Sequence, residues 1–354
     1  MEHPLSTPPG LGRLGEIPHV ALAHTPTPLE AMKNLSTRVG RAQLYVKRDD
    51  CTGLAFGGNK VRQLEYYLGE ALERSADTVL ITGAVQSNFI RLAAAAARKL
   101  GLDCHLQLEE RVPDVDPIYR SSGNVLIDRL LGATLYSYPD GQDEAGADRR
   151  LAEIGVELEQ RGRRPYIIPL GPGHAPLGAL GYVQAAAEIL EQLSAMDLTI
   201  DEVVVASGSG YTHAGLLFGL RALGSRIRVT GICVRRKSAV QADRIRDHCR
   251  AIAGLLGVRQ TVEDADIHLI DAFLDPGYGM LSAPVIEAMK WAARDEGLIL
   301  DPVYTAKTMA GCIERARDSS EPLGRRLLFI HTGGQPAMFA YERALTSAFE
   351  NDDD

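Results

Sequence analysis

Short apolar runs of strand length alternate along the chain with longer segments in which apolar residues recur at helical spacing. The strand-like runs lie at 44–46, 78–82, 104–108, 166–170, 203–206, 229–234 and 327–330. The helical patterns include residues 92–100, 181–193, 214–223 and 285–293. Alternation of this kind predicts an α/β protein whose parallel sheets are covered by helices on both faces.

Turns rich in glycine and small residues follow several of the predicted strands. They lie at 82–84, 171–173, 207–210 and 332–334. Ligands of open α/β sheets bind in the crevice beyond the carboxyl ends of the strands, so these turns predict the position of a site. Two polar stretches, 139–150 and 316–325, are predicted to be loops.

Composition narrows the class of protein further. The 354 residues are 45% hydrophobic and 24% charged, as in an ordinary soluble globular protein. The formal net charge of -8 argues against nucleic acid or an anionic membrane as the main partner, and no apolar run is long enough to span a membrane. The five cysteines are widely spaced without a CxxC pair, and the N-terminus lacks a signal pattern. We therefore expect a cytoplasmic protein without a metal site.

Lys60 is the most conspicuous candidate for chemistry. It follows Gly57, Gly58 and Asn59 and stands at the start of a helical pattern over 61–68. The N-terminus of a helix disfavours an ammonium group and so favours a neutral amine, the form that makes a Schiff base with an aldehyde. A solvated surface lysine after a glycine turn is the alternative, and it is the commoner case for such a motif alone.

A strand, a glycine-rich loop and a helix follow one another around residues 203–215. Backbone N–H groups at the start of the helix, with the hydroxyls of Ser207, Ser209 and Thr212, would form a cradle for phosphate. The segment lacks the ending of a Walker loop, and His213 occupies the place of the third glycine in a dinucleotide fingerprint. A small phosphate group is therefore expected, unless the glycines serve only the turn between strand and helix.

Polar side chains near other strand ends have two interpretations each. Ser87 or Asn88 would cap the helix that begins there, or the same helix start would hold a substrate carboxylate beside the apolar Phe89. Tyr278 and Tyr304 lie in loops, where they either pack with wet hydroxyls or supply proton donors to a cleft.

Thr332 follows the last predicted strand, where its hydroxyl could meet a ring nitrogen or cap the following turn. His174, His213 and His331 also lie in loops near strand ends. No carboxylate or cysteine stands at ligand spacing from them, so we interpret these histidines as structural.

Taken in order, these motifs resemble the fold-type II pyridoxal phosphate enzymes, and within them the family of 1-aminocyclopropane-1-carboxylate deaminase and D-cysteine desulfhydrase. The resemblance extends from residue 24 to residue 336. It is carried by Lys-Arg-Asp-Asp (47–50), Gly-Gly-Asn-Lys (57–60), Gln-Ser-Asn (86–88), Pro-Leu-Gly-Ala-Leu-Gly-Tyr (176–182), Gly-Tyr-Gly (277–279), Asp-Pro-Val-Tyr (301–304) and Thr-Gly-Gly (332–334).

The resemblance implies a fold similar to the β subunit of tryptophan synthase, with two three-layer α/β domains and parallel sheets. A large cofactor-binding domain would comprise residues 1–63 and 177–354, and a smaller α/β domain would be inserted at 64–176. Relatives of this fold are commonly homodimers, so a homodimer is expected.

The resemblance also implies a role for each motif. Lys60 would hold pyridoxal 5'-phosphate as a Schiff base and move the Cα proton, Asn88 would bond the ring hydroxyl, and Thr332 would face the pyridine nitrogen. The expected cofactor-binding residues are Asn59, Lys60, Asn88, Ser207, Gly208, Ser209, Gly210, Tyr211, Thr212 and Thr332. The expected catalytic residues are Lys60, Ser87, Tyr278 and Tyr304, and the expected substrate-binding residues are Ser87, Asn88, Phe89, His174, Tyr278 and Tyr304.

The implied reaction is α,β-elimination from a small β-substituted amino acid, with D-cysteine giving pyruvate, hydrogen sulfide and ammonia as the leading case. Thr305 and Thr332 stand where cyclopropane deaminases carry Glu and Leu, which favours the desulfhydrase side. Phe89, the 171–175 segment and Tyr211 depart from the family pattern and leave the substrate open.

Three alternatives remain at this point. The enzyme could be a 1-aminocyclopropane-1-carboxylate deaminase or an L-cysteate sulfo-lyase, in which His174 or Arg91 would serve an anionic leaving group. The third alternative is a catalytically silent protein that binds pyridoxal phosphate and has a regulatory role.

Overall fold

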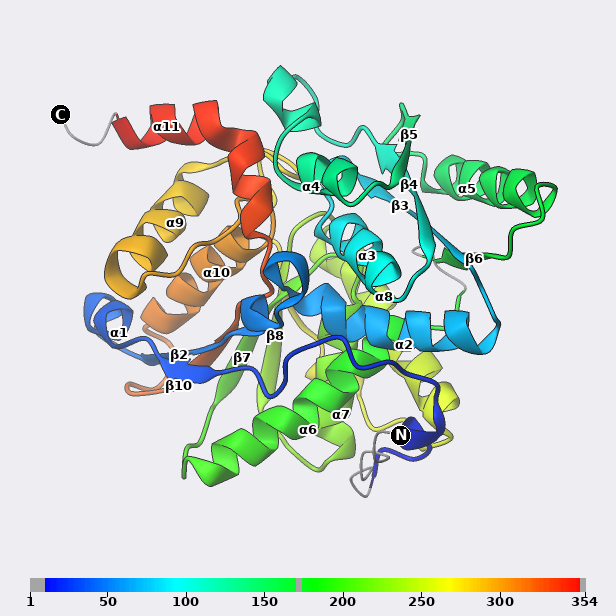
Figure 1. Ribbon diagram of the computed structural model, residues 1–354. Coiled ribbons are helices and arrows are strands. Elements are labelled where there is room, and N and C mark those ends of the chain that lie inside the picture. The colour runs from blue at the N-terminus through cyan, green and yellow to red at the C-terminus, as the bar shows by residue number, and fades with distance from the viewer. Residues whose placement is uncertain (1–9, 170–173, 351–354) are drawn as a thin grey trace.

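The computed structural model describes residues 10–169 and 174–350, and these residues form an α/β protein with two sheets (Figure 1). The larger sheet has the strand order β1-β2-β10-β7-β8-β9 and the smaller one the order β5-β4-β3-β6. The strands are β1 (Leu29–Ala31), β2 (Gln43–Lys47), β3 (Thr78–Ala84), β4 (Asp103–Glu109), β5 (Thr134–Tyr138), β6 (Pro165–Ile168), β7 (Glu202–Ser207), β8 (Arg228–Cys233), β9 (His268–Ile270) and β10 (Arg326–Ile330).

Eleven α-helices in the described part of the chain connect and cover these strands. They are α1 (Lys33–Val39), α2 (Asn59–Glu73), α3 (Asn88–Lys99), α4 (Asn124–Leu130), α5 (Glu144–Glu159), α6 (Leu180–Ala195), α7 (Tyr211–Ala222), α8 (Ser238–Leu256), α9 (Ala283–Glu296), α10 (Thr305–Arg317) and α11 (Glu342–Glu350). In Figure 1, α6 and α7 lie below the larger sheet, α9 and α10 lie above it, and α3, α4 and α5 surround the smaller sheet.

The α/β class predicted from the apolar pattern is confirmed, and each predicted strand and helix has a counterpart. The strands pair parallel as predicted except at one edge of the larger sheet, where β1 pairs antiparallel with β2. The stretch 139–150 is only partly a loop, since α5 begins at Glu144, where the Asp143 carboxylate accepts from the Gly146 N–H at 2.8 Å. The predicted turn at 171–173 lies outside the described residues.

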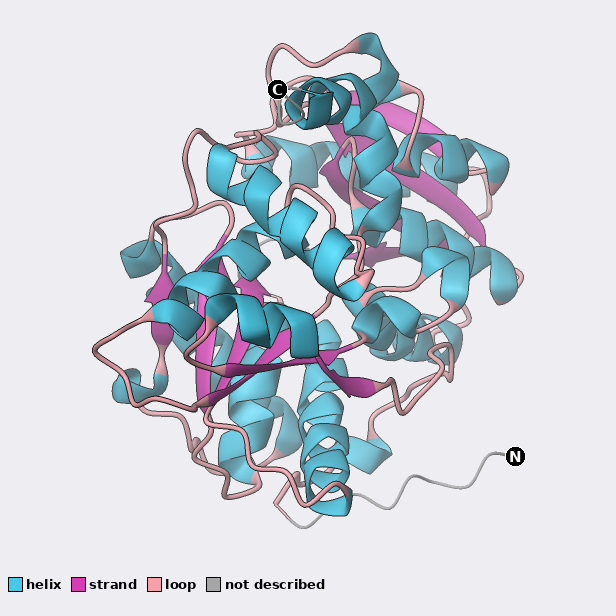
Figure 2. Cartoon of the chain, turned by 90° about the vertical axis from the view of Figure 1, so that its left-hand side faces the viewer, coloured by secondary structure: helices cyan, strands magenta, loops and turns pink. Residues whose placement is uncertain are grey.

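The larger sheet is buried on both faces, as the alternation of side chains along a strand requires. In β7, Val203 and Val205 pack into the hydrophobic cluster formed with α6 and α7, while Val204 packs into the cluster formed with α9 and α10. Figure 2 shows strands enclosed between layers of helices. The smaller sheet is built in the same way, with Leu80 of β3 packed against Leu151 and Ile154 of α5.

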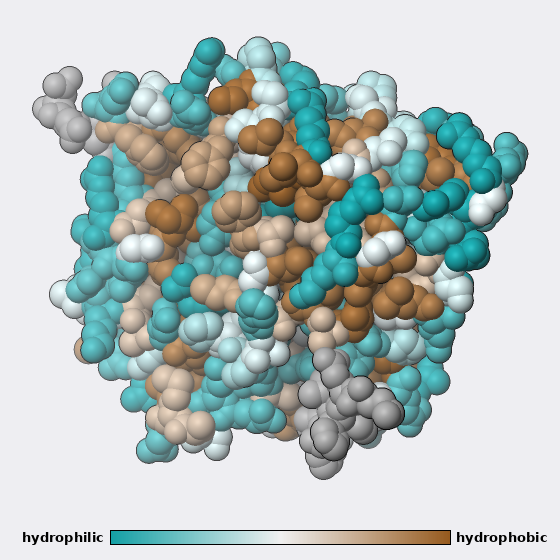
Figure 3. All heavy atoms as spheres, viewed as in Figure 1, coloured by the Kyte–Doolittle hydropathy of each residue, from teal (hydrophilic) through white to brown (hydrophobic). Residues whose placement is uncertain are grey.

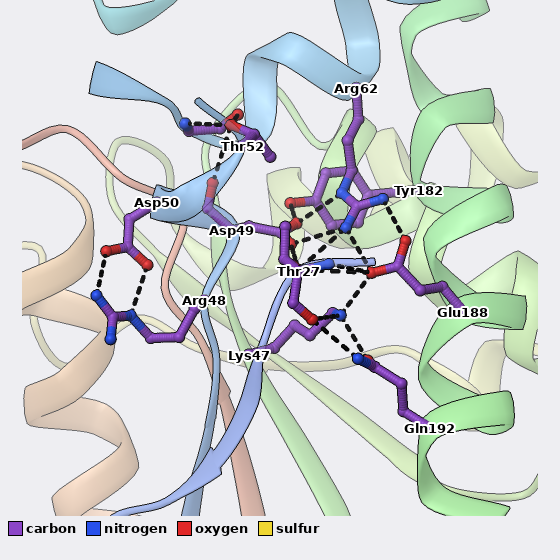
Figure 4. Close-up of polar contacts among 11 residues, drawn as sticks. Thr27, Lys47, Arg48, Asp49, Asp50, Thr52, Arg62, Tyr182, Glu188 and Gln192 are labelled. Atoms are coloured by element: carbon purple, nitrogen blue, oxygen red, sulfur yellow. Dashed lines mark hydrogen bonds and ion pairs between the residues drawn. The ribbon is translucent and has the colours of Figure 1, made fainter. Parts of the chain in front are cut away.

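A buried ionic network fixes the first turn of α2 (Figure 4). The guanidinium of Arg62 contacts Asp49 at 3.0 Å and Glu188 of α6 at 2.8 Å, and its side chain is only 3% exposed. Lys47, at the end of β2, donates to the same Glu188 carboxylate at 2.5 Å and to the Thr27 carbonyl at 2.6 Å. The two cations and two anions balance, so strand β2, helix α6 and the start of α2 are held together at the position where Lys60 projects.

The surface is mostly hydrophilic around the rim of the face seen in Figure 1, and hydrophobic side chains gather toward its upper centre (Figure 3). The exposed hydrophobic residues of the described chain include Leu126 of α4 and Phe339, which are 57% and 56% exposed. No helix in residues 10–169 or 174–350 combines the length and apolar character needed to cross a membrane.

Candidate active site

The turn that carries Lys60 is pressed against the loop after β10. Gly58 has φ +129° and Gly333 has φ +85°, and a Cβ placed on Gly333 would lie 2.7 Å from the Gly58 Cα. The backbone N–H of Asn59 donates to the Thr332 carbonyl at 3.0 Å. Only glycine allows this approach, so these glycines set the position of the lysine relative to Thr332.

The Lys60 amine lies in an apolar and weakly polar environment. Its Nζ donates to Gln63 Oε1 at 3.1 Å and lies 4.9 Å from the centre of the Phe89 ring. Burial lowers the pKa of Lys60 from 10.5 to about 8, because the charged form loses its hydration. About a tenth of the amine is therefore neutral at pH 7, far more than for an ordinary lysine, and the neutral form is the one that attacks an aldehyde.

Two cavities of about 110 Å³ and about 60 Å³ meet at this lysine. We call the smaller one the inner cavity and the larger one the outer cavity. Both are lined by Lys60, Ser87, Phe89, Gly208, Ser209 and Tyr304. The inner cavity is also lined by Asn59, Asn88, Ala206, Gly210, Thr212, Thr332 and Gly333. Ser87, Gly208 and Thr332 follow the carboxyl ends of β3, β7 and β10, which is where ligands of open α/β sheets bind.

Donors converge on one end of the inner cavity, at the start of α7. Thr212 Oγ1 accepts two hydrogen bonds, from Asn59 Nδ2 and from Gln63 Nε2, each at 2.8 Å. Its own hydroxyl hydrogen is then left to donate to a group in the cavity. The first N–H groups of α7 and the backbone at Gly208 and Ser209 add further positive potential. This end of the cavity can hold a phosphate.

The start of α3 lies across from the lysine. Ser87 is the N-cap of this helix, and its Oγ accepts from the Ile90 N–H at 3.3 Å. The Asn88 side-chain oxygen accepts from Asn124 Nδ2 at 3.0 Å, which orients the amide toward the inner cavity that it lines. Ser87 can therefore cap α3 while the same helix start binds a ligand, because a capped helix still presents free N–H groups to an anion.

The loop tyrosines meet at the outer cavity. The hydroxyls of Tyr278 and Tyr304 are 2.5 Å apart, and both side chains line that cavity. Burial raises the pKa of Tyr304 well above its ordinary value, and the neighbouring Tyr278 adds to the effect. Tyr304 therefore stays protonated at neutral pH, and its hydroxyl can donate a proton to a departing group.

Several candidate side chains do not reach either cavity. His174 is exposed and lies in hollows elsewhere on the surface. The Ser207 hydroxyl contacts His213 Nδ1 at 3.1 Å and accepts from Gln241 Nε2 at 3.0 Å, and Tyr211 packs on the His248 ring with centroids 4.6 Å apart. Their predicted contacts with the cofactor or substrate thus gain no support from the geometry.

Thr305 and Arg91 are also turned away from the cavities. The Thr305 hydroxyl donates to the buried Asp301 carboxylate at 2.7 Å, and Arg91 donates to the Gly57 carbonyl at 3.0 Å. Both side chains therefore stabilise the protein around the site, and neither lines a cavity where a ligand would lie.

Other residues at the site were not predicted from the sequence. Gln63 bonds both Lys60 and Thr212, and its position three residues after the lysine on one helix face could have indicated it. The outer cavity is also lined by charged residues, namely Glu109, Arg111, Glu144, Asp148, Arg235, Arg236 and Arg244. Arg111 and Arg236 follow the carboxyl ends of β4 and β8, so the same argument that pointed to the glycine turns could have indicated them.

Comparison with known proteins agrees with this geometry. Residues 20–333 match the family described as pyridoxal-phosphate dependent enzyme, and the chain belongs to this family. Curated relatives include D-cysteine desulfhydrases of Salmonella choleraesuis (strain SC-B67) and Salmonella typhi, which are 43% and 42% identical over 331 residues. Each alignment covers 94% of this chain and 98% of the relative.

Solved structures support the same assignment. A crystal structure described as an ACC deaminase homologue aligns with a TM-score of 0.85 at 40% identity, over 96% of this chain and 99% of that chain. An O-ureido-L-serine synthase aligns with a TM-score of 0.63 at 16% identity, over 94% and 95% of the two chains, which shows a shared fold alone. The predicted fold-type II architecture and the predicted enzyme class are confirmed.

Pyridoxal phosphate is the cofactor of this family, and the inner cavity fits it. Lys60 offers a buried amine of lowered pKa to the aldehyde, and the start of α7 with Thr212 offers donors to the phosphate. Thr332 lines the same cavity and can offer a neutral hydroxyl to the ring nitrogen. Contacts by the individual residues stay predictions.

Proposed function

We propose that the enzyme eliminates the β-substituent of a small amino acid, and that D-cysteine is converted to pyruvate, hydrogen sulfide and ammonia. The observation that carries this proposal is the buried, low-pKa amine of Lys60 on a cavity that also holds the Tyr278–Tyr304 hydroxyl pair. A base for the Cα proton and an acid for the leaving group are thus available in one site. The relatives named D-cysteine desulfhydrase, which are 43% and 42% identical to this chain, support the choice of substrate.

Each residue then has a task that its contacts permit. Ser87 and the first N–H groups of α3 bind the substrate carboxylate, and the neutral Lys60 amine takes the Cα proton. The bound cofactor supplies the electron sink that makes this proton acidic. The tyrosine pair gives a proton to the departing thiolate, and Phe89 covers the amine and excludes water. We also expect two copies to associate in the cytoplasm.

The assignment is tested by product assays on purified enzyme. Sulfide and pyruvate from D-cysteine are the expected products. Release of 2-oxobutanoate from 1-aminocyclopropane-1-carboxylate, in place of sulfide from D-cysteine, would instead assign the deaminase activity. If no amino acid yields a keto acid, the protein is not a lyase and the silent, cofactor-binding alternative holds.

Tyr304→Phe should lower kcat for D-cysteine by about 10²- to 10⁴-fold, because the variant lacks the hydroxyl that protonates the thiolate. β-Chloro-D-alanine provides the matched control, since chloride departs without a proton and its elimination should lose far less. Steady-state rates with both substrates make the comparison. An equal loss with both would mean that Tyr304 acts on another step.

The pH dependence of cofactor capture provides a second test. Apoenzyme should bind pyridoxal phosphate covalently at a rate that rises about tenfold per pH unit and levels off near pH 8, because only the neutral Lys60 amine attacks the aldehyde. Stopped-flow absorbance measures this rate directly. A lysine with its ordinary pKa of 10.5 would keep gaining rate well beyond that pH, and such a profile would contradict the lowered pKa.

A further inference from the structure

The hydroxyl pair at the outer cavity comes from two separate turns of the chain. Tyr278 lies in the segment between β9 and α9, and Tyr304 lies directly before α10. Their hydroxyls are nevertheless 2.5 Å apart, across 26 residues of sequence. A contact this short between two turns requires that other groups hold both turns in place relative to each other.

The backbone of Tyr304 is held by Asp301, whose side chain is completely buried. One carboxylate oxygen of Asp301 accepts from the N–H groups of Val303 and Tyr304, each at 2.9 Å. The other oxygen accepts from the Thr305 N–H at 2.8 Å. An aspartate is favoured at the start of a helix, because its negative charge binds N–H groups that have no partner within the helix. Tyr304 is therefore fixed to the beginning of α10.

Tyr278 lies in a tight turn with weaker internal bonding. The Met280 N–H donates to the Gly277 carbonyl at 3.3 Å, and this bond closes the turn around Tyr278. Gly279 has φ +70°, in the left-handed region that glycine adopts without strain. Because the closing bond is long, the direction of Tyr278 depends on contacts from outside the turn.

Lys307 supplies such a contact from α10. Its side chain is completely buried, and its Nζ donates to the Gly277 carbonyl at 2.9 Å and to the Leu274 carbonyl at 3.2 Å. The lysine lies in the first turn of the helix that begins directly after Tyr304. One amine thus connects the helix that fixes Tyr304 to the turn that carries Tyr278.

No ion pair within the described part of the chain stabilises this buried amine. Burial lowers the pKa of Lys307 from 10.5 to about 8, and the charge of Asp275 opposes this shift. An ammonium buried without a paired carboxylate costs stability, and groups with pKa values shifted in this way gather at functional sites. Whether neutral or charged, the amine keeps at least two N–H donors, which is the number that the two carbonyls require.

A second buried side chain holds the other end of the same turn. The Tyr341 hydroxyl donates to the Gly279 carbonyl at 2.7 Å, and its ring packs edge-on against Tyr119 with centroids 5.5 Å apart. A Cβ placed on Gly279 would lie 2.9 Å from this hydroxyl, so the turn meets Tyr341 with no room for a side chain. Groups from elsewhere in the chain therefore bind the carbonyls on both sides of Tyr278.

We infer that Lys307, together with Tyr341, positions Tyr278 so that the Tyr278–Tyr304 pair can protonate the departing thiolate. Lys307 lines neither cavity and acts only through backbone carbonyls, so it is a positioning residue. This inference rests on the proposed elimination and assigns the residues that hold its proton donor. A displacement of about 1 Å at a reacting group can cost about 10²-fold in rate, so the bonds that fix this turn contribute to the chemical step.

Lys307→Met should lower kcat for D-cysteine by about 10- to 100-fold and leave KM nearly unchanged, because thiolate departure follows binding. Elimination from β-chloro-D-alanine should lose far less, since chloride departs without a proton. In an enzyme that already carries Tyr304→Phe, adding Lys307→Met should cost little more, because both changes act on one step. Steady-state rates with the two substrates measure these effects.

Two further variants make the comparison decisive. Tyr341→Phe removes one hydroxyl and keeps the ring, so it should fold and show the same selective loss with D-cysteine, even if Lys307→Met does not fold. Lys290→Met is the matched control, because Lys290 of α9 also donates to a backbone carbonyl, that of Ala348 at 3.1 Å, and lines neither cavity. A Tyr341→Phe enzyme that loses equally with both substrates would show that these bonds stabilise the fold alone, and the inference would fail.

A spectroscopic measurement makes the result independent of turnover. 3-Fluorotyrosine incorporated in place of Tyr278 gives the cofactor-loaded enzyme a fluorine NMR signal at this turn. The signal should move or broaden in Lys307→Met and in Tyr341→Phe and stay unchanged in Lys290→Met. D-cysteine turnover with a signal that neither variant changes would overturn the inference and leave the proposed function intact. A displaced signal in an enzyme that eliminates from neither substrate would instead refute the proposed elimination, while the two residues would still position Tyr278.

Discussion

Lys60→Ala enzyme is expected to lose at least about 10⁴-fold in turnover of D-cysteine while keeping its fold. Lys60 is the one lysine that lines either cavity among the described residues, so no other amine can hold the cofactor or take the Cα proton. Its side chain makes a single hydrogen bond, to Gln63, and its burial disfavours the charged form. Removing it should therefore cost little stability.

Steady-state kinetics and thermal unfolding monitored by circular dichroism measure the two parts of this prediction. Added methylamine should restore some activity, because a small amine can enter the space left by the side chain. Lys99→Ala is the control, since this exposed lysine lies at the far end of α3. A Lys60→Ala enzyme that retained even one percent of turnover would exclude the lysine as the proton-transfer group.

Arg62→Met should lower the free energy of unfolding by about 3–5 kcal/mol. We expect no larger loss of stability from any other single substitution near the site. The variant leaves Asp49 and Glu188 buried with only the Lys47 ammonium to balance them. It also releases the first turn of α2 from β2 and α6, so the amine of Lys60 would lose its fixed position. Urea unfolding at neutral pH measures the change.

Arg74→Met, at the C-cap of the same helix, is the matched control. Its guanidinium pairs with Glu70 at 2.6 Å, but the side chain is 64% exposed, so its loss should cost no more than about 1 kcal/mol. Equal midpoints for the two variants would show that the buried network contributes no more than a surface ion pair. A low kcat in an Arg62→Met enzyme of normal stability would show that the network acts on lysine position alone.

The fold was predictable wherever a strand is long and apolar. Strands β3, β7 and β10 are almost completely buried, and each contains a run of at least three consecutive apolar residues. Strands β1 and β9 have three residues each, and β5 has no fully buried residue, so their formation depends on pairing with neighbours rather than on their own pattern. The start of α5 was hidden because its apolar face begins only after several polar residues.

The sequence predicted which turns form the site, but it did not predict the direction of every side chain in those turns. Lys60 and Thr332 follow the parallel strands β2 and β10 of the larger sheet, Ser87 follows β3 of the smaller sheet, and all three line the inner cavity at the strand ends. Ser207 was predicted to face a phosphate, but it is the last residue of β7 and its side chain points to His213. A motif alone cannot show this, because successive side chains of a strand point to opposite faces, and a shift of one residue in the end of the strand reverses the direction of each.

The close approach of Gly58 and Gly333 has a consequence for protein engineering. A side chain at Gly333 would strike the backbone of Gly58, and a Cβ at Gly58 would crowd the Thr332 carbonyl at 3.0 Å, so libraries that vary these glycines would return inactive clones. The wall of the outer cavity should tolerate substitution better, because long side chains line it and they come from separate strand ends. Directed evolution toward new substrates should therefore succeed at Arg111 and its neighbours and fail at the glycines beneath the lysine.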